Sequence, residues 1–337
     1  LHYLYRSIED YGIGHLCSVN WYRDEEGMMH VCSDFMPSVE TPDVEPEPRD
    51  KSQQVFDEGK KTYLPKKYID NNKYLQFKWL SVFSSNDDSE LVKGLLEFAD
   101  SYYTWIKQLN ANENQLGLEN IERCIKDYER IKSNINEFLT DPVKMQIFRL
   151  MNAAMFMQLW HSKGNNQEQV RNDQQELSFE YYKKRALDTT IFKGQIAAWR
   201  PFQLAFILLN LDGVFQSKND PKWEKRRNLV DLVWFPTGGG KTESYLGIIA
   251  LVSINRRLTY NNGSGKGVAA IMRYTLRLLT TQQFQRALRL ILAIEQIRKW
   301  NIFNLGDEEF SIGLYVGESS LKNHYSDLAD EIRRNWT

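Results

Sequence analysis

Three consecutive glycines followed by a lysine and a threonine are the residues of this chain best suited to hold a phosphate chain. They stand in the sequence FPTGGGKTES and are Gly238, Gly239, Gly240, Lys241 and Thr242. Glycine lets successive backbone N–H groups curve around an anion without side-chain clash. Lys241 adds a mobile ammonium for the outer phosphates, and the Thr242 hydroxyl suits a Mg²⁺ ligand. The pattern predicts a site for ATP and Mg²⁺.

The surroundings of these glycines match that chemistry. An apolar run at 230–234 predicts a buried strand, and a helix is expected from about 241 to 257. The first N–H groups of a helix lack partners within it, and the helix dipole adds partial positive charge there. Pro236 and Thr237 complete the predicted loop. The alternative is a glycine turn that only joins strand to helix, and it leaves the Lys–Thr pair in register unexplained.

The segment PTGGGKT resembles motif I of superfamily 2 helicases. The general phosphate-loop pattern has a glycine where this chain has Phe235, and in that superfamily this position is commonly not glycine. Upstream, the Arg-Pro-x-Gln element of AAWRPFQLAFILLN is similar to the Q motif of the same enzymes. The resemblance implies that Arg200 and Gln203 lie at the adenine, where an amide pairs a donor and an acceptor with the base edge. Alone, Gln203 would be interpreted as a capped or half-exposed residue.

A second strand (267–272) and helix (275–299) follow, in the position of motif Ia. The resemblance implies contact with a nucleic-acid backbone through Arg273 and Thr275, with the helix N-terminus contributing N–H groups. Arg277 and, in the later turn IGLYVGESS, Gly317 are expected along the same groove. A solvated helix face is the alternative. One face of the helix is apolar and should pack on the sheet: Leu276, Leu279, Ala287, Leu290, Ile291, Ile294 and Ile297.

Longer stretches resemble the large helicase of the DISARM anti-phage system. These are WRPFQLAFILLNL, VWFPTGGGKTESYLG and MRYTLRLLTTQQFQRA, together with upstream IGHLCSVNW, DFMPSVETPDVEP and LMNAAMFMQ. The resemblance implies an ATP-driven motor that tracks the DNA sugar-phosphate backbone and works with other defence proteins. The DEAH-type box of that family has no matching residues here.

The acidic segment GDEEF at 306–310 could be mistaken for the Asp-Glu pair of a Walker B motif. Walker B carboxylates follow a buried apolar strand, whereas NIFNLG precedes Asp307. We therefore expect a solvated loop. Without motif II and a second lobe with its arginine finger, we expect a fragment that is inactive as an ATPase by itself.

These patterns predict an α/β chain with three regions. Residues 1–85 should form a mixed, strand-rich accessory region, and residues 86–190 a helical region with a polar loop at 161–176. Strands alternating with helices over 191–337 predict a parallel sheet. With the resemblance, this region is an incomplete RecA-like ATP-binding lobe. Further helices are expected over 178–199, from Pro201 onward, and over 318–335; a last strand is expected at 310–316.

Composition excludes several classes of protein. The 337 residues are 42% hydrophobic and 26% charged, with a formal net charge of −1, so no polyanion partner is indicated globally. No run of about eighteen apolar residues indicates a membrane helix. The three cysteines, Cys17, Cys32 and Cys124, fit a reducing cytoplasm. His15 and His30 form His-x-Cys pairs with Cys17 and Cys32, and we favour structural burial over zinc because knuckle spacing is absent.

Two other functions stay open on these residues. A nucleotide-binding scaffold could gate assembly of a defence complex without translocating, and an ATPase assay with DNA separates it from a motor. Another P-loop machine, such as an AAA+ or signalling ATPase, would need a sensor arginine and a lid. Gln203 and the second helix, rich in Thr, Arg and Gln, argue against that class.

Overall fold

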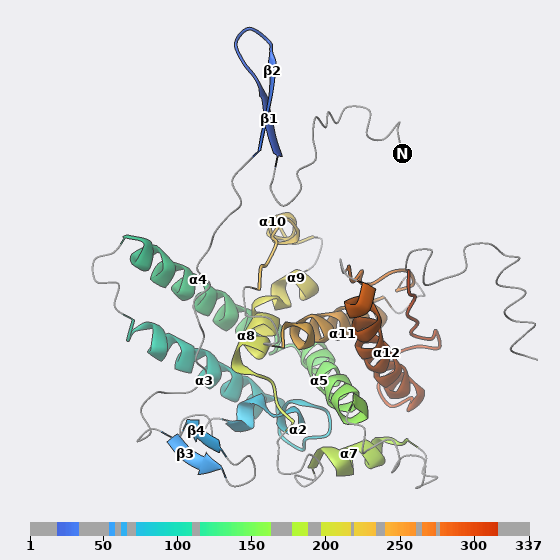
Figure 1. Ribbon diagram of the computed structural model, residues 1–337. Coiled ribbons are helices and arrows are strands. Elements are labelled where there is room, and N and C mark those ends of the chain that lie inside the picture. Colours follow the sequence, from blue (N-terminus) through green and yellow to red (C-terminus); the bar gives the residue numbers. More distant parts are fainter. Residues whose placement is uncertain are drawn as a thin grey trace, which may run out of the picture. The chain divides into compact units, whose positions relative to one another are not determined.

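A computed structural model describes most of the helical part of the chain (Figure 1). The described residues are 19–33, 54–57, 62–65, 72–109, 115–162, 177–187, 197–216, 219–233, 240–260, 265–273 and 277–315. The chain divides into two compact units, Leu1–Pro46 and Glu47–Thr337, called here the N-terminal unit and the main unit. Each unit is considered by itself.

The N-terminal unit contains an antiparallel hairpin of β1 (Val19–Arg23) and β2 (Met29–Ser33). Asp24 organises its turn, because one carboxylate oxygen accepts hydrogen bonds from the backbone N–H groups of Glu26 and Met28. The other oxygen contacts His30 Nε2 at 2.7 Å, and this contact lowers the pKa of Asp24. Tight turns of this kind need local side-chain partners because the hairpin has no buried core.

The main unit begins with a second antiparallel hairpin and continues almost entirely as helices. Both hairpins lie in the region expected to be rich in strands. The elements of the main unit are β3 (Gln54–Asp57), β4 (Thr62–Pro65), η2 (Asn72–Leu75), α2 (Phe77–Leu80), α3 (Asp88–Ile106), α4 (Gln115–Phe138), α5 (Pro142–Ser162), α7 (Phe179–Leu187), α8 (Pro201–Leu209), α9 (Leu211–Phe215), α10 (Trp223–Arg227), α11 (Lys241–Thr259) and α12 (Arg277–Lys299).

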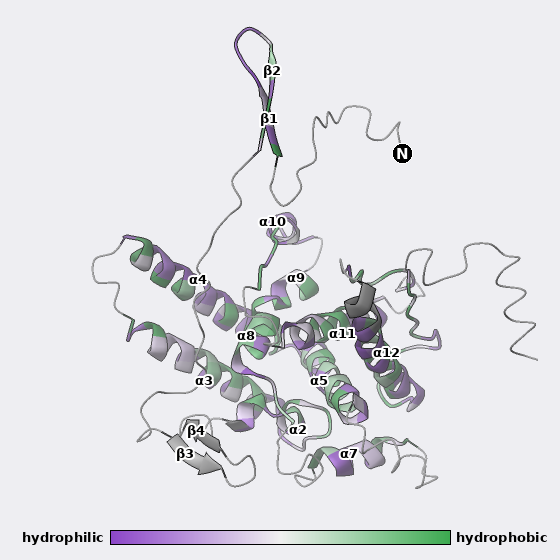
Figure 2. Cartoon of the chain, viewed as in Figure 1, coloured by the Kyte–Doolittle hydropathy of each residue, from purple (hydrophilic) through white to green (hydrophobic). Residues whose placement is uncertain are grey.

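Helix α5 is the centre of the main unit. It is apolar on all sides and buried along most of its length, as expected for a helix surrounded by others (Figure 2). Helices α2, α11 and α12 pack directly against it. The predicted apolar face of 275–299 is confirmed for Ala287, Leu290, Ile291, Ile294 and Ile297, which are buried. In the described part this face packs on helices α5 and α11. One hydrophobic core therefore joins helices on both sides of the domain boundary that was expected at residue 190.

Arg149 of α5 fixes the irregular connection between α2 and α3. Its guanidinium donates to the carbonyl oxygens of Ser81, Ser84 and Asn86 and to the carboxylate of Asp88 at 2.7 Å. This half-buried side chain thus satisfies three backbone carbonyl groups that regular structure would otherwise pair, and it also binds one carboxylate.

The helix expected over 178–199 does not include its last three residues, 197–199. Helix α7 ends at Leu187, and Ala197–Arg200 is extended: Ala198 bridges Gln76, and the Trp199 backbone N–H donates to Leu75 O. Arg200 precedes Pro201, and the residue before a proline is disfavoured in helical conformation. Burial of the Trp199 indole, whose Nε1 donates to Asn152 Oδ1 at 2.7 Å, fixes the extended path. The expectation for these residues is therefore wrong.

The parallel sheet stays a prediction. The described parts of its three expected strands, 230–233, 267–272 and 310–315, are non-helical, and no strand ladder joins them among those residues. They carry exposed apolar side chains that such a sheet would bury: Val230, Leu232, Val268, Ile271 and Tyr315. The expected helix at 318–335 and most of the polar loop at 161–176 lie outside the described residues.

Candidate nucleotide site at the start of helix α11

Helix α11 starts where the glycine loop was predicted to end. Gly240 is its N-cap, with φ of 89° and ψ of 26° in the left-handed region. A Cβ atom at this position would lie 2.8 Å from Gln203 Nε2, so backbone conformation and close approach both require glycine. Lys241 and Thr242 occupy the first turn and are half-buried. The helix predicted from about residue 241 is thus confirmed, whereas the strand before it stays a prediction.

The amide of Gln203 joins helix α8 to this turn. Its Nε2 donates to Gly240 O at 2.7 Å, and its Oε1 accepts from the Arg200 backbone N–H at 2.8 Å. Gln203 is 5% exposed. These two bonds leave one N–H and one oxygen lone pair of the amide for a further partner. The two motifs found in separate stretches of sequence therefore lie against each other.

Charged side chains surround the same turn. The nearest atom of the Arg200 guanidinium, Nη1, lies 4.0 Å from where a Cβ of residue 240 would be. Glu243, in the first turn of α11, forms an ion pair with Arg286 of α12. Burial lowers the pKa of Arg286, with a smaller contribution from the charge of Arg289. The ion pair between Glu243 and Arg286 links the two helices.

The remaining predicted residues are placed less completely. Pro236, Thr237, Gly238 and Gly239 lie outside the described residues, as do Thr275 and Gly317. Arg273 is exposed, directly before an undescribed stretch, and Arg277 is the first residue of α12. Backbone contact by these four nucleic-acid candidates, Arg273, Thr275, Arg277 and Gly317, stays a prediction.

Two further expectations concern acidic and metal-binding residues. The solvated loop at 306–310 is confirmed: Asp307, Glu308 and Glu309 are exposed, and Glu308 pairs with Lys266. His15 and Cys17 lie outside the described residues. His30 contacts Asp24 and stacks on Tyr22 with ring centroids 5.0 Å apart.

Cys32, in contrast, is exposed, so its expected burial is wrong. The described part of this unit is a two-stranded hairpin, and a hairpin by itself has no second layer to cover the Cys32 side chain. Within the described residues no group of three His, Cys, Asp or Glu side chains could hold a metal ion.

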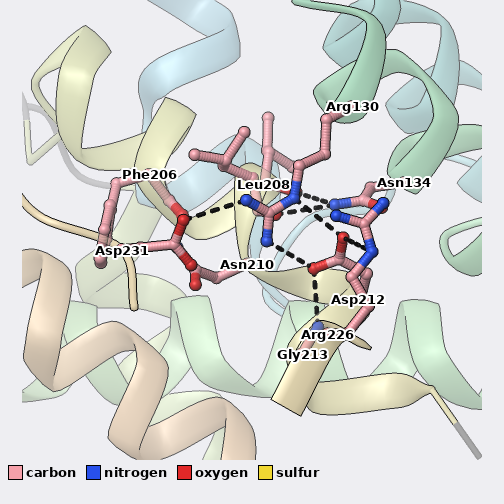
Figure 3. A network of polar contacts seen from close by, with 10 residues as sticks. Arg130, Asn134, Phe206, Leu208, Asn210, Asp212, Gly213, Arg226 and Asp231 are labelled. Carbon is pink, nitrogen blue, oxygen red and sulfur yellow. Dashed lines mark hydrogen bonds and ion pairs between the residues drawn. The ribbon is translucent and has the colours of Figure 1, made fainter. Parts of the chain in front are cut away.

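Sequence reasoning missed a charged network beside the segment that leads into the loop (Figure 3). Arg130 of α4 binds Asp212 of α9 through two hydrogen bonds of 2.9 Å and Asp231 through one of 3.0 Å. Arg226 of α10 adds a contact of 3.1 Å to Asp212. The only local signal was Asn134, a polar residue within the apolar stripe of α4 that Ile131 and Ile135 share.

No helix in the described part of the chain has the length and apolar character needed to cross a membrane.

Comparison with known proteins relates the chain to the DISARM defence proteins. Over 97% of its length it is 35% identical to DISARM protein DrmA of Bacillus paralicheniformis. The chain spans 27% of that relative's length. No protein-family model matches the chain. The DISARM part of the resemblance is confirmed, whereas the assignment to superfamily 2 stays a prediction.

Proposed function

We propose that this chain forms the ATP-binding part of a DNA translocase of superfamily 2 that acts in defence against phage. The observation that carries the proposal is the hydrogen bond from Gln203 Nε2 to Gly240 O. It joins the Arg-Pro-x-Gln element to the end of the glycine loop, as expected for two motifs that serve one nucleotide. The relation to a DISARM protein supports the role in defence and partners within such a system.

The residues of the site have distinct proposed roles. Gly238, Gly239 and Gly240 offer backbone N–H groups to the phosphates, and Lys241 neutralises the outer ones. The Thr242 hydroxyl suits Mg²⁺, which would supply charge neutralisation between the β- and γ-phosphates when bound. The half-buried position of Thr242 in the first turn of α11 fits that role. Arg200 and Gln203 lie on the adenine side.

The proposed architecture is an incomplete RecA-like lobe whose parallel sheet is built from 230–234, 267–272 and 310–316. The exposed apolar side chains of Val230 and Leu232 support it, because a sheet at this segment would remove them from water. DNA would contact Arg273, Thr275, Arg277 and Gly317. The carboxylate that activates water lies outside the motifs found here, so we assign no residue of this chain to that step.

The test compares the complete protein with its Lys241→Ala variant in ATP binding and in ATP hydrolysis with and without DNA. We expect hydrolysis to fall about a hundredfold or more, because a charge that stabilises the transition state is removed. Lys93→Ala, at an exposed lysine of α3, is the matched control and should leave hydrolysis unchanged. Unchanged hydrolysis in Lys241→Ala would contradict the proposal. ATP binding without hydrolysis that DNA stimulates would favour a nucleotide-gated scaffold instead.

A further inference from the structure

One face of helix α4 carries polar residues that all point toward the chain between α8 and the glycine loop. Arg130 and Asn134 are one helical turn apart and share that face. Asn134 Nδ2 donates to the carbonyl oxygens of Leu208 and Leu209, at 3.0 and 2.9 Å, where helix α8 ends. Asn134 is 3% exposed, so these bonds are shielded from water. Helix α4 therefore holds the end of the helix that carries Gln203.

Arg130 reaches the other flank of the candidate site. Its Nε and Nη2 bind both carboxylate oxygens of Asp212, and its Nη1 binds Asp231 Oδ1 at 3.0 Å (Figure 3). Asp231 belongs to the run 230–234 that enters the glycine loop. The contact spans 101 residues of sequence and links α4 to that run. Arg130 thus links Asp212 of α9 to the segment that leads into the proposed phosphate-binding glycines.

The environment makes this arrangement rigid. The side chains of Arg130 and Asp212 are 15% and 3% exposed, and Asp212 Oδ1 also accepts from the Gly213 N–H at 2.7 Å. Burial alone would lower the pKa of Arg130, but hydrogen bonds to Asp212 and Asp231 outweigh burial and raise it. Arg130 and Arg226 together bind the carboxylates of Asp212 and Asp231. Burial raises the pKa of Asp127, on which the charges of Arg130 and Asp231 also act. This hydrogen-bonded network resists rearrangement, because moving Arg130 would take two hydrogen bonds from the buried Asp212 carboxylate.

We propose that Arg130 is a positioning residue for nucleotide binding. By holding Asp231 while Asn134 holds the end of α8, helix α4 sets the spacing between Gln203 on the adenine side and the glycines on the phosphate side. The inference rests on the proposed function, since it deepens the account of the same site. It requires a loss of nucleotide affinity when the Arg130–Asp231 link is cut, even though neither side chain touches the nucleotide.

The experiment uses Asp231→Leu in the complete protein, with binding of a fluorescent ATP analogue and thermal unfolding measured side by side. The substitution keeps roughly the shape of the side chain, removes the oxygen that accepts from Arg130 Nη1, and leaves the Arg130–Asp212 pair in place. We expect affinity to fall on the order of tenfold in folded protein, because misplacing one wall of a site weakens the contacts on the other. Arg226→Gln is the matched control: it removes one contact to Asp212 without touching Asp231 and should keep wild-type affinity.

A double variant separates positioning from general destabilisation. If Arg130 acts through Asp231, the affinity loss of Arg130→Gln with Asp231→Leu should equal that of Arg130→Gln alone; fully additive losses would overturn the inference. If Arg130→Gln does not fold, Asp231→Leu against Arg226→Gln decides. Wild-type affinity in Asp231→Leu, with weak binding by Lys241→Ala, overturns the positioning role alone. Wild-type affinity in Lys241→Ala would remove the proposed function and the positioning role together.

Discussion

The side-chain amide of Gln203 has both of its ends in use, and each end serves a different segment. Its oxygen accepts from the backbone at the start of α8, and its nitrogen donates to the last glycine before α11. A buried amide in this position costs free energy unless both groups are paired. Gln203 is therefore as much a structural link between two segments as a candidate contact to adenine.

Replacing Gln203 by glutamate should break one half of that link. The carboxylate can still accept from Arg200 N–H, but it cannot donate to Gly240 O and would place negative charge against that carbonyl. We expect a loss of about 1–3 kcal/mol in the free energy of unfolding and weaker ATP binding. Calorimetry and nucleotide titration of the complete protein measure both quantities.

Gln296→Glu is the control for that variant, because Gln296 Nε2 makes the same kind of bond to Leu177 O at 2.9 Å, on a different helix. It should lower stability and leave nucleotide affinity unchanged. Equal affinity losses in the two variants would show that Gln203 acts only through stability.

Some of these residues could be found from sequence and some could not. Gly240, Lys241 and Thr242 were predicted because phosphate chemistry demands small, cationic and hydroxyl groups at consecutive positions. The Arg130–Asp231 pair was missed because charges on a helix and on a distant run give no local signal. Glu243 lies within the helix expected from about 241, but its partner Arg286 depends on how α11 and α12 pack.

Among the elements, α8 and α11 pack closely through Gly247. A Cβ at that position would lie 2.8 Å from Ile207 Cδ1 and 3.1 Å from the Trp199 ring. Ile207 and Trp199 are both fully buried, so neither can move aside freely. The small residue lets the helix that carries Lys241 approach the helix that carries Gln203.

Gly247→Ala should therefore destabilise the protein although alanine favours helices. Helix propensity would contribute up to about 1 kcal/mol, while forcing a methyl group into a packed contact costs about 1–3 kcal/mol. We expect a lower midpoint of urea unfolding. Gly213→Ala in α9 is the control, since nothing lies within 4 Å of the added Cβ; it should be neutral or stabilising. A stabilising Gly247→Ala would refute the close-packing argument.

The helices themselves were largely predictable. The expected ranges 241–257 and 275–299 correspond to α11 (Lys241–Thr259) and α12 (Arg277–Lys299), because apolar spacing and helix length were both clear. The extended path of Ala197–Arg200 was not predicted, because tertiary contacts to η2 and α5 set it. Tertiary packing overrides local preference at such junctions.

At the scale of the whole molecule, helices from both sides of the domain boundary expected at residue 190 share one hydrophobic core. Helix α5 belongs to the region expected to be a helical insert, yet α11 and α12 of the predicted ATP-binding lobe pack on it. Periodicity in the sequence identifies an apolar face but does not say which neighbour covers it. The domain boundaries themselves stay a prediction.

Because helices α5, α11 and α12 share one core, we expect them to unfold together in local opening events. In hydrogen exchange of the complete protein, amides of α5, α11 and α12 should exchange with one common opening free energy. Met155→Ala in α5, at a side chain that is 1% exposed, should lower that free energy by about 2–5 kcal/mol in all three helices. Amides of the β1–β2 hairpin, in the other compact unit, should not change. Protection lost in α5 alone would mean that the helices open separately.

Arg149 has a consequence for the order in which the chain folds. The turn at 81–88 owes its shape to a guanidinium that arrives from more than sixty positions later in the sequence. Ser81 O also accepts a local hydrogen bond from the Ser84 N–H, but the carbonyl oxygens of Ser84 and Asn86 lack the guanidinium until helix α5 docks. We therefore expect the turn to reach its final shape only after the central helix packs against it.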